Sequence, residues 1–233
     1  RRATSHNAIQ FLLSKNLNIQ TVLDVGASKN TWYLQRVFPD KKHILFEPMI
    51  EFKDKTEKSY EEIDYELHTV ALSDTDDPNG QMFYNRHLND VDPDYIWCGV
   101  VPKGVSSYHG CTHPKRNIKI TTLDNFLSDK KYKKPYYLKV DTDGGEMSVL
   151  RGGTKTLENV EVIQVEATCD NRIWNHISWF NDHGFELWEI VDHLYINGKM
   201  HQVDLIFVNQ VLYKTISTDL KAKKERIIQD ESK

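Results

Sequence analysis

The sequence predicts a doubly wound α/β fold, a three-layer sandwich whose mostly parallel sheet ends in an antiparallel C-terminal hairpin. Short apolar runs alternate with stretches of helical spacing along most of the chain, which is typical of a parallel sheet with helices on both faces. Acidic or polar residues follow several of these runs, at the strand ends where such sheets bind ligands. The last two runs flank Asn197-Gly198, a dipeptide that favours a tight hairpin turn.

Local signals bound each predicted element. Apolar residues recur at helical spacing in the first helix, and Pro39 ends the second. Strands are predicted at 21–25, 43–46, 65–71, 82–84, 118–121, 136–141, 160–167, 185–191 and 203–208. Helices are predicted at 6–16, 31–38, 50–61, 123–130, 145–150 and 172–182.

The length of 233 residues favours a single domain, which we place at residues 1–216. Residues 85–117 interrupt the alternation, since they hold three glycines and three prolines without a sustained period. We expect an irregular insert here that serves as a lid or a binding loop. Residues 217–233 are highly charged and have few apolar anchors, so they predict a solvated C-terminal tail.

Composition excludes several classes of function. The chain has 30 basic and 34 acidic residues, a net charge of −4, and no basic stripe that could follow a nucleic-acid backbone. No apolar stretch approaches the ~20 residues that span a bilayer, and the start lacks a signal-like segment. Three widely spaced cysteines suit reduced thiols better than a disulfide framework. We therefore expect a cytoplasmic protein without a nucleic-acid partner; its oligomeric state is not indicated.

A glycine turn after the first strand and an acid after the second predict a nucleoside cofactor. Glu47 lies 21 residues after Gly26, the spacing at which an acid on the second strand can bind both ribose hydroxyls. The loop at 27–30 lacks the second and third glycines of a dinucleotide fingerprint. Asp24 would face a pyrophosphate poorly, whereas it can attract an ammonium group. S-adenosylmethionine carries an ammonium, a ribose and a sulfonium, so the pattern favours this cofactor.

Five motifs occur in order along the chain: Asp24-Val25-Gly26-Ala27-Ser28, Phe46-Glu47-Pro48, Ala71-Leu72-Ser73-Asp74, Leu138-Lys139-Val140-Asp141-Thr142-Asp143-Gly144-Gly145-Glu146 and Val149-Leu150-Arg151-Gly152-Gly153. Together they resemble the FkbM-type family of S-adenosylmethionine-dependent methyltransferases. The family usually has glycine where Asn30 stands, and asparagine also tolerates a positive φ. The resemblance implies a Rossmann-like class I methyltransferase fold and O-methylation of a hydroxyl on a sugar or another small molecule.

The resemblance also implies roles for individual residues. The loop at 24–28 would hold the methionine part of the cofactor, Glu47 would bind the ribose, and residues 71–74 would border the adenine. Asp141 would lie where the cofactor meets a small-molecule or glycan acceptor. The cofactor-binding residues expected on this basis are Asp24, Gly26, Ala27, Ser28, Glu47, Pro48, Ser73 and Asp141.

Methyl transfer to a hydroxyl requires an aligned oxygen and a base that removes its proton. Strand alternation places Lys139 and Asp141 on one face of a strand, and the lysine suits the role of structural partner to a carboxylate. Asp141 could instead cap the following helix, although Asp143 is better placed for that. The catalytic candidates are Asp141, Glu166 and His109, with His87 and His113 as further histidines of the insert.

Other readings stay open at this point. Asp141, Glu166 and Asp170-Asn171 carry the oxygen ligands that Mg²⁺ prefers, but capping acids and an Asx turn explain them better, so a divalent metal is not favoured. A nicotinamide-dependent reductase would need the missing glycines. A nucleoside-binding module without catalysis is the alternative from another class. Calorimetry with S-adenosylhomocysteine against NAD discriminates among these functions.

Overall fold

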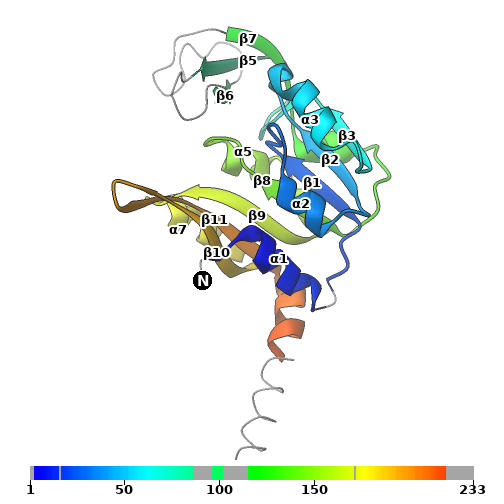
Figure 1. The fold of residues 1–233 in the computed structure, drawn as a ribbon, viewed down its shortest axis with the longest axis vertical. Coiled ribbons are helices and arrows are strands. Elements are labelled where there is room, and N and C mark those ends of the chain that lie inside the picture. The colour runs from blue at the N-terminus through cyan, green and yellow to red at the C-terminus, as the bar shows by residue number, and fades with distance from the viewer. Residues whose placement is uncertain (1–2, 16, 87–95, 102–114, 171, 219–233) are drawn as a thin grey trace, which may run out of the picture. The chain divides into compact units, whose positions relative to one another are not determined.

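The computed structural model describes residues 3–15, 17–86, 96–101, 115–170 and 172–218 (Figure 1). Residues that form close neighbours group into two compact units. We name Ile19–Val160 the central unit, and Arg1–Asn18 with Glu161–Lys233 the terminal unit. Each unit is described by itself.

The central unit holds most of the predicted alternation of strands and helices. Its helices are α2 (Trp32–Val37), the 3₁₀ turn η1 (Ile50–Phe52), α3 (Lys53–Ser59), α4 (Leu123–Leu127), α5 (Glu146–Arg151) and α6 (Thr154–Leu157). Its strands are β1 (Thr21–Val25), β2 (Lys42–Phe46), β3 (Tyr65–His68), β4 (Ala71–Leu72), β5 (Asp77–Arg86), β6 (Ile96–Val101), β7 (Lys115–Thr121) and β8 (Tyr136–Val140).

Four of these strands form a parallel array in the order β8-β1-β2-β3. Every residue of β1 and β8 is buried, including the apolar side chains of Leu23 and Leu138. Strands covered on both faces have such continuous apolar runs, and this explains why their positions were predictable from the sequence. Since parallel strands point the same way, their carboxyl ends share one edge of the array.

A second sheet in the order β4-β7-β5-β6 corrects the expectation of an irregular insert (Figure 1). The end of β5, all of β6 and the start of β7 lie within 85–117. β5 pairs antiparallel with both β6 and β7, and Phe83 is opposite Gly99 in the first pairing. The two remaining segments of the insert, 87–95 and 102–114, lie outside the described residues.

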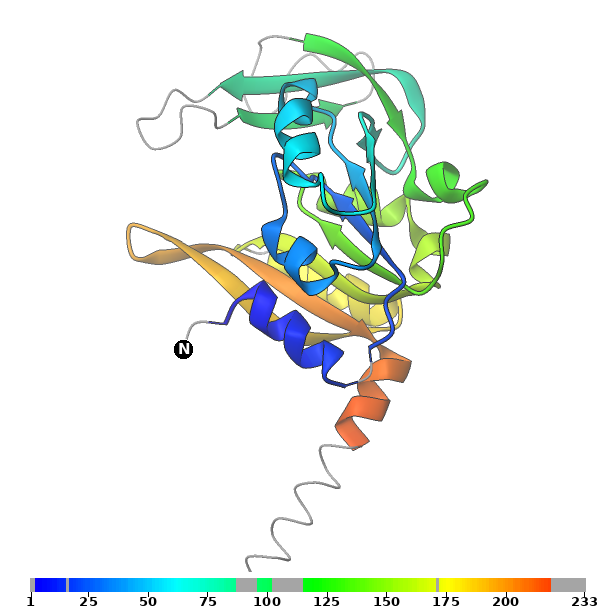
Figure 2. The ribbon, with the colours of Figure 1, turned by 45° about the vertical axis from the view of Figure 1, so that its right-hand side comes forward.

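The terminal unit is built around three antiparallel strands in the order β10-β11-β9. Its elements are α1 (Ser5–Leu13), β9 (Val160–Thr168), which begins at the last residue of the central unit, α7 (Arg172–Asp182), β10 (Phe185–Ile196) and β11 (Lys199–Asn209). Residues 210–218 continue as a helix, and 219–233 are not among the described residues. β10 and β11 form a long hairpin (Figure 2). Its turn has Asn197 at φ 50° and Gly198 at φ 78°, so the predicted hairpin is confirmed.

The predicted fold class is confirmed by the parallel strands of the central unit and the antiparallel hairpin of the terminal unit. β1 and α7 have the predicted bounds, whereas several helices are shorter than expected and α6 was not predicted. Single-domain organisation over 1–216 stays a prediction. In the described ranges, no helix has both the length and the apolar character needed to cross a membrane.

Candidate functional site

The candidate site lies at the carboxyl ends of three neighbouring parallel strands in the central unit. The strand register places Val25 opposite both Phe46 and Val140. The hydrogen-bond ladder continues one step further, since the N–H of Gly26 donates to the Phe46 carbonyl at 2.9 Å and that of Asp141 to the Val25 carbonyl at 3.0 Å. The residues that follow the three strands are therefore neighbours: Gly26, Glu47 and Asp141.

The first loop requires glycine at position 26 because of its neighbour across the sheet. Gly26 has a φ of 80°, and a Cβ built on it would lie 1.7 Å from the backbone oxygen of Asp141. Lys139 donates from Nζ to the Gly26 carbonyl at 2.8 Å, which holds the turn from the other side. The absence of a side chain at Gly26 thus lets the loops after β1 and β8 approach each other. From the sequence, this glycine had been interpreted only as part of a cofactor-binding turn.

Glu47 connects the loops that follow β1 and β2. Its Oε2 accepts the backbone N–H of Ser28 at 2.7 Å, and its Oε1 accepts that of Met49 at 2.8 Å. The residue is 5% exposed, and this burial raises the pKa of its carboxyl to about 7 against the opposing effect of the two N–H donors. A carboxylate has about four acceptor positions, so roughly two remain for other donors.

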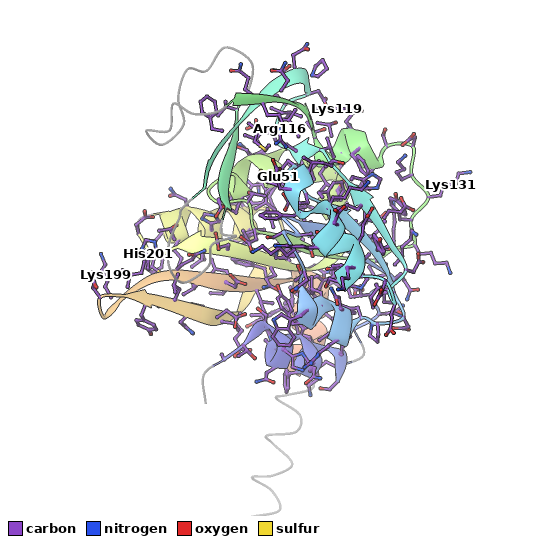
Figure 3. The ribbon with its side chains drawn as sticks, turned by 45° about the horizontal axis from the view of Figure 1, so that its top comes forward. Glu51, Arg116, Lys119, Lys131, Lys199 and His201 are labelled. Carbon is purple, nitrogen blue, oxygen red and sulfur yellow. The ribbon has the colours of Figure 1, made fainter. Side chains whose placement is uncertain are left out.

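Nearby residues of both loops are held in place. Ala27 is buried, Ser28 has a φ of 48°, and Pro48 is half-buried between Glu47 and Met49. Figure 3 labels Glu51 on the following turn and Arg116 on β7, which form a bidentate ion pair. This pair connects the loop after β2 to the second sheet.

Lys139 joins two predicted site acids. Its Nζ is 3.3 Å from Oδ1 of Asp24 and 3.3 Å from Oδ2 of Asp141. The Asp24 side chain is fully buried and also accepts a hydrogen bond from the hydroxyl of Tyr60, whereas 39% of the Asp141 side chain is exposed. The prediction that Lys139 is a structural partner of a carboxylate is confirmed, and Asp141 is the acid of this group that solvent reaches.

The turn after β8 depends on a buried glutamate that sequence reasoning left without a role. Oε1 of Glu146 accepts the N–H groups of Thr142 at 3.0 Å and Gly144 at 2.8 Å. These bonds hold a turn in which Asp143 and Gly144 both have positive φ. The cap position of α5 belongs to Gly145, so neither Asp141 nor Asp143, the two acids considered as alternative caps, occupies it. A glutamate in a first helical turn after two glycines was the available signal.

Ser73 lies in the loop after β4, where its N–H donates to the Thr121 carbonyl at 3.0 Å. Its own carbonyl faces α5, because a Cβ on Gly152 would lie 2.0 Å from that oxygen. Asp74, the next residue, forms an ion pair with Arg151 at 3.0 Å. This loop is therefore fixed to the helix that follows the Asp141 turn.

The two remaining catalytic candidates, Glu166 and His109, are not among the described residues of the central unit. Glu166 belongs to the terminal unit, where it lies opposite Asp204 in the pairing of β9 with β11. His109, like His87 and His113, lies outside the described residues. Within the described ranges, no group of three or more histidine, cysteine or acidic side chains could hold a metal ion.

The parallel core and its strand-end loops define a Rossmann-like α/β protein. Residues 24–187 match the sequence profile of the Methyltransferase FkbM domain, and this match covers more than half of the chain. The chain therefore belongs to the FkbM methyltransferase domain family, and the resemblance noted in its motifs is confirmed. No curated protein matches the chain.

Solved structures with similar folds share little sequence with the chain. A putative RNA methyltransferase from Pyrococcus horikoshii is 13% identical, with a TM-score of 0.45 over 87% of this chain and 81% of that one. A putative tRNA (m1A22) methyltransferase from Streptococcus pneumoniae is 15% identical, with a TM-score of 0.45 over 86% and 68%. TrmK from M. capricolum in complex with S-adenosyl-homocysteine is 11% identical, with a TM-score of 0.47 over 90% and 70%.

Proposed function

We propose that the chain binds S-adenosylmethionine at the ends of β1, β2 and β8 and transfers its methyl group to a hydroxyl of a sugar or another small molecule. The observation that carries the cofactor assignment is the environment of Glu47. Two backbone N–H groups hold its carboxylate at a strand end, and about two acceptor positions are left for the adjacent hydroxyls of a ribose.

The methionine part of the cofactor fits the backbone of the first loop better than the side chain of Asp24. That carboxylate is fully buried and 3.3 Å from Lys139, so an ammonium group would compete with a lysine already in place. Asp24 instead neutralises Lys139, which supports the turn through the Gly26 carbonyl. We therefore assign Asp24 a positioning role and assign the contacts with the methionine part to residues 26–28.

Asp141 is the general-base candidate that the central unit supports best. Its carboxylate is partly exposed at the end of β8, and Lys139 fixes one of its oxygens at 3.3 Å. The bound cofactor would supply the electrophilic methyl group. Asp141 would orient an acceptor hydroxyl and take its proton as the oxygen forms its bond to carbon. Glu166 and His109 stay predictions for the same role.

The first loop and Asp141 fit the two alternative functions less well. A nicotinamide cofactor needs close approach of a pyrophosphate to the first loop, but Ala27 and Ser28 carry side chains there. A non-catalytic nucleoside-binding module does not need an exposed acid beside the cofactor. Asp141 supplies such an acid.

Transfer of labelled methyl groups tests the acceptor class directly. The full-length protein is incubated with labelled S-adenosylmethionine and separate pools of neutral oligosaccharides, small hydroxylated metabolites and tRNA. The proposal predicts label on a hydroxyl oxygen in one of the first two pools, and loss of that transfer in Asp141→Asn with S-adenosylhomocysteine binding retained. Label on tRNA alone, or on nitrogen or carbon, would contradict the proposed acceptor but not the proposed cofactor.

A further inference from the structure

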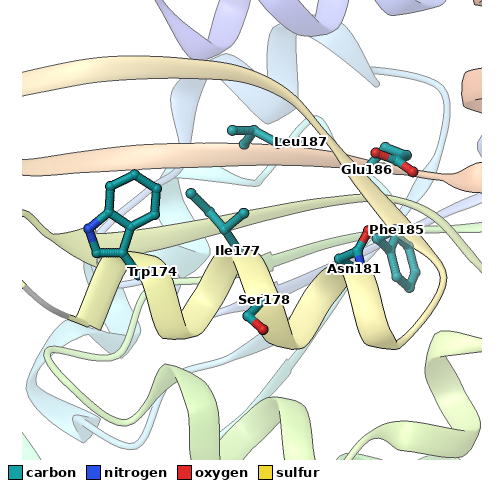
Figure 4. Close-up of a pocket in the computed structure, with 7 residues that line it drawn as sticks. All are labelled: Trp174, Ile177, Ser178, Asn181, Phe185, Glu186 and Leu187. Atoms are coloured by element: carbon teal, nitrogen blue, oxygen red, sulfur yellow. The ribbon is translucent and has the colours of Figure 1, made fainter.

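A groove in the terminal unit is lined by none of the residues assigned to methyl transfer. It has a volume of about 480 Å³, within the range of roughly 300–1,000 Å³ typical of small-ligand sites. Figure 4 shows it between α7 and the first residues of β10. The seven residues that line it are Trp174, Ile177, Ser178, Asn181, Phe185, Glu186 and Leu187.

The helical repeat explains why one side of the groove is amphipathic. The four α7 residues that line it follow the spacing i, i+3, i+4 and i+7, which places them on one face of the helix. The opposite face carries Phe180 and His176, which are buried. The groove face of α7 is thus free to bind a ligand, while the other face anchors the helix.

The groove combines an exposed aromatic ring with polar groups that have capacity to bind. Trp174 is 71% exposed, an unusual state for an indole. Among the described residues, the side chains of Ser178 and Asn181 have no hydrogen-bond partner. Glu186 is half-buried and receives one long hydrogen bond, at 3.4 Å, from the amide of Gln210. Oε2 of Glu186 therefore keeps its acceptor positions.

The charge of the groove excludes two kinds of ligand. None of the seven lining residues is lysine or arginine, and Glu186 contributes a negative charge. Phosphorylated ligands and nucleic-acid backbones would be repelled rather than neutralised. A purely apolar ligand would bury the polar groups of Asn181 and Glu186 without hydrogen bonds, which is costly.

We propose that this groove binds a neutral saccharide. The apolar face of a sugar ring carries C–H groups with partial positive charge, which pack on the negative face of an indole such as Trp174. The ring hydroxyls both donate and accept, so they match the amide of Asn181 and the carboxylate of Glu186. This function goes beyond methyl transfer and uses no residue of the cofactor site.

Saturation-transfer NMR on the full-length protein tests the proposal with four neutral probes: maltotriose, cellotriose, triacetylchitotriose and α-mannotriose. At least one probe should bind, with the strongest transfer to the C–H protons of one ring face. Trp174→Ala should raise the Kd of that probe by at least about tenfold, as truncation of a central tryptophan does. The matched control is Trp32→Ala, because Trp32 is also exposed on a helix but packs on Arg36 in the central unit.

Binding lost in Trp174→Ala and retained in Trp32→Ala supports a saccharide site. The absence of binding by all four probes overturns it, as does equal binding by the wild type and Trp174→Ala. Oligouridine is added as a competitor, and displacement of the bound probe would assign the groove to a nucleic acid instead. No S-adenosyl compound is present in these measurements, so their failure leaves the proposed methyl transfer untouched.

Discussion

The backbone oxygen of Asp141 lies where the side chain of any residue other than glycine at position 26 would begin. A Cβ on Gly26 would be 1.7 Å from that oxygen, far inside contact distance. The loops that follow β1 and β8 are therefore mutually dependent. This dependence positions the exposed carboxylate of Asp141 beside the loop assigned to the cofactor.

Substitution of Gly26 should therefore destabilise the protein itself. Gly26→Ala combines an unfavourable positive φ with a clash between the new Cβ and the Asp141 backbone. Gly184→Ala has a similar positive φ of 82°, but its new Cβ would have no atom within 4 Å. We expect Gly184→Ala to cost about 1–2 kcal/mol from the left-handed conformation alone. Gly26→Ala should cost distinctly more in the free energy of unfolding, measured by urea denaturation. Equal losses of unfolding free energy in the two variants would show that the contact with the Asp141 backbone adds no cost.

The raised pKa of Glu47 predicts a pH dependence of stability. Between the ordinary value of 4.5 and the folded value of about 7, the folded protein keeps a proton that the unfolded chain has released. The contribution of Glu47 to the free energy of unfolding is fully present below pH 4.5 and is lost as the pH rises to 7, a fall of about 3 kcal/mol. Urea unfolding of the wild type and Glu47→Gln at pH 4.5 and 8 measures this difference. The same pH dependence in both proteins would contradict it.

Substitution of Lys139 should lower the free energy of unfolding, because it removes the partner of the buried Asp24. In Lys139→Met, the fully buried Asp24 loses the ammonium 3.3 Å away, and we expect a loss of about 3–5 kcal/mol in unfolding free energy. Adding Asp24→Asn should recover part of this loss, because it removes the uncompensated charge. Lys42→Met is the matched control: Lys42 also pairs with two carboxylates, Asp64 and Glu66, but at the surface, where about 0–1 kcal/mol is expected. Equal losses would show that Lys139 acts as a surface lysine does.

The elements that the sequence predicted are those specified by nearby residues. β1 consists of consecutive buried residues, and the turn of the last hairpin has the residues that positive φ requires. The predicted strands at 82–84 and 118–121 lie within β5 and β7, but their pairing into a second sheet was missed. Its pairings join segments that are distant in the sequence, such as Ala71 with Ile120, and no local period indicates them. Loops without regular periods can still contribute strands when their partners lie elsewhere in the chain.

The sequence predicted which residues lie at the strand ends of the candidate site, but not which contacts their side chains form. The spacing of Gly26 and Glu47 correctly indicated adjacent strand ends. The same spacing does not indicate how deeply each side chain is buried. Asp24 was therefore expected to face a ligand, whereas its carboxylate is fully buried beside Lys139. The role of Glu146 depends on N–H groups oriented by the positive φ of Asp143 and Gly144, which the sequence does not display.

Glu47→Ala should weaken the binding of S-adenosylhomocysteine by about 1.5–3 kcal/mol, as expected for hydrogen bonds to a charged group. Binding to the wild type should also tighten as the pH rises through 7, because ribose hydroxyls donate to the ionised carboxylate. Glu51→Ala is the control, since it removes an ion pair from the same loop without removing a proposed cofactor contact. Wild-type affinity in Glu47→Ala would exclude Glu47 from the site.

Isothermal titration calorimetry of the wild-type protein at pH 8, with S-adenosylhomocysteine and NAD in parallel, tests the central claim most directly. The claim is that the strand-end loops of the central unit bind the methyl donor of an FkbM-family enzyme. We predict saturable binding of one S-adenosylhomocysteine per chain and no measurable heat from NAD. Binding of NAD in preference, or no binding of S-adenosylhomocysteine, would contradict the proposed cofactor site.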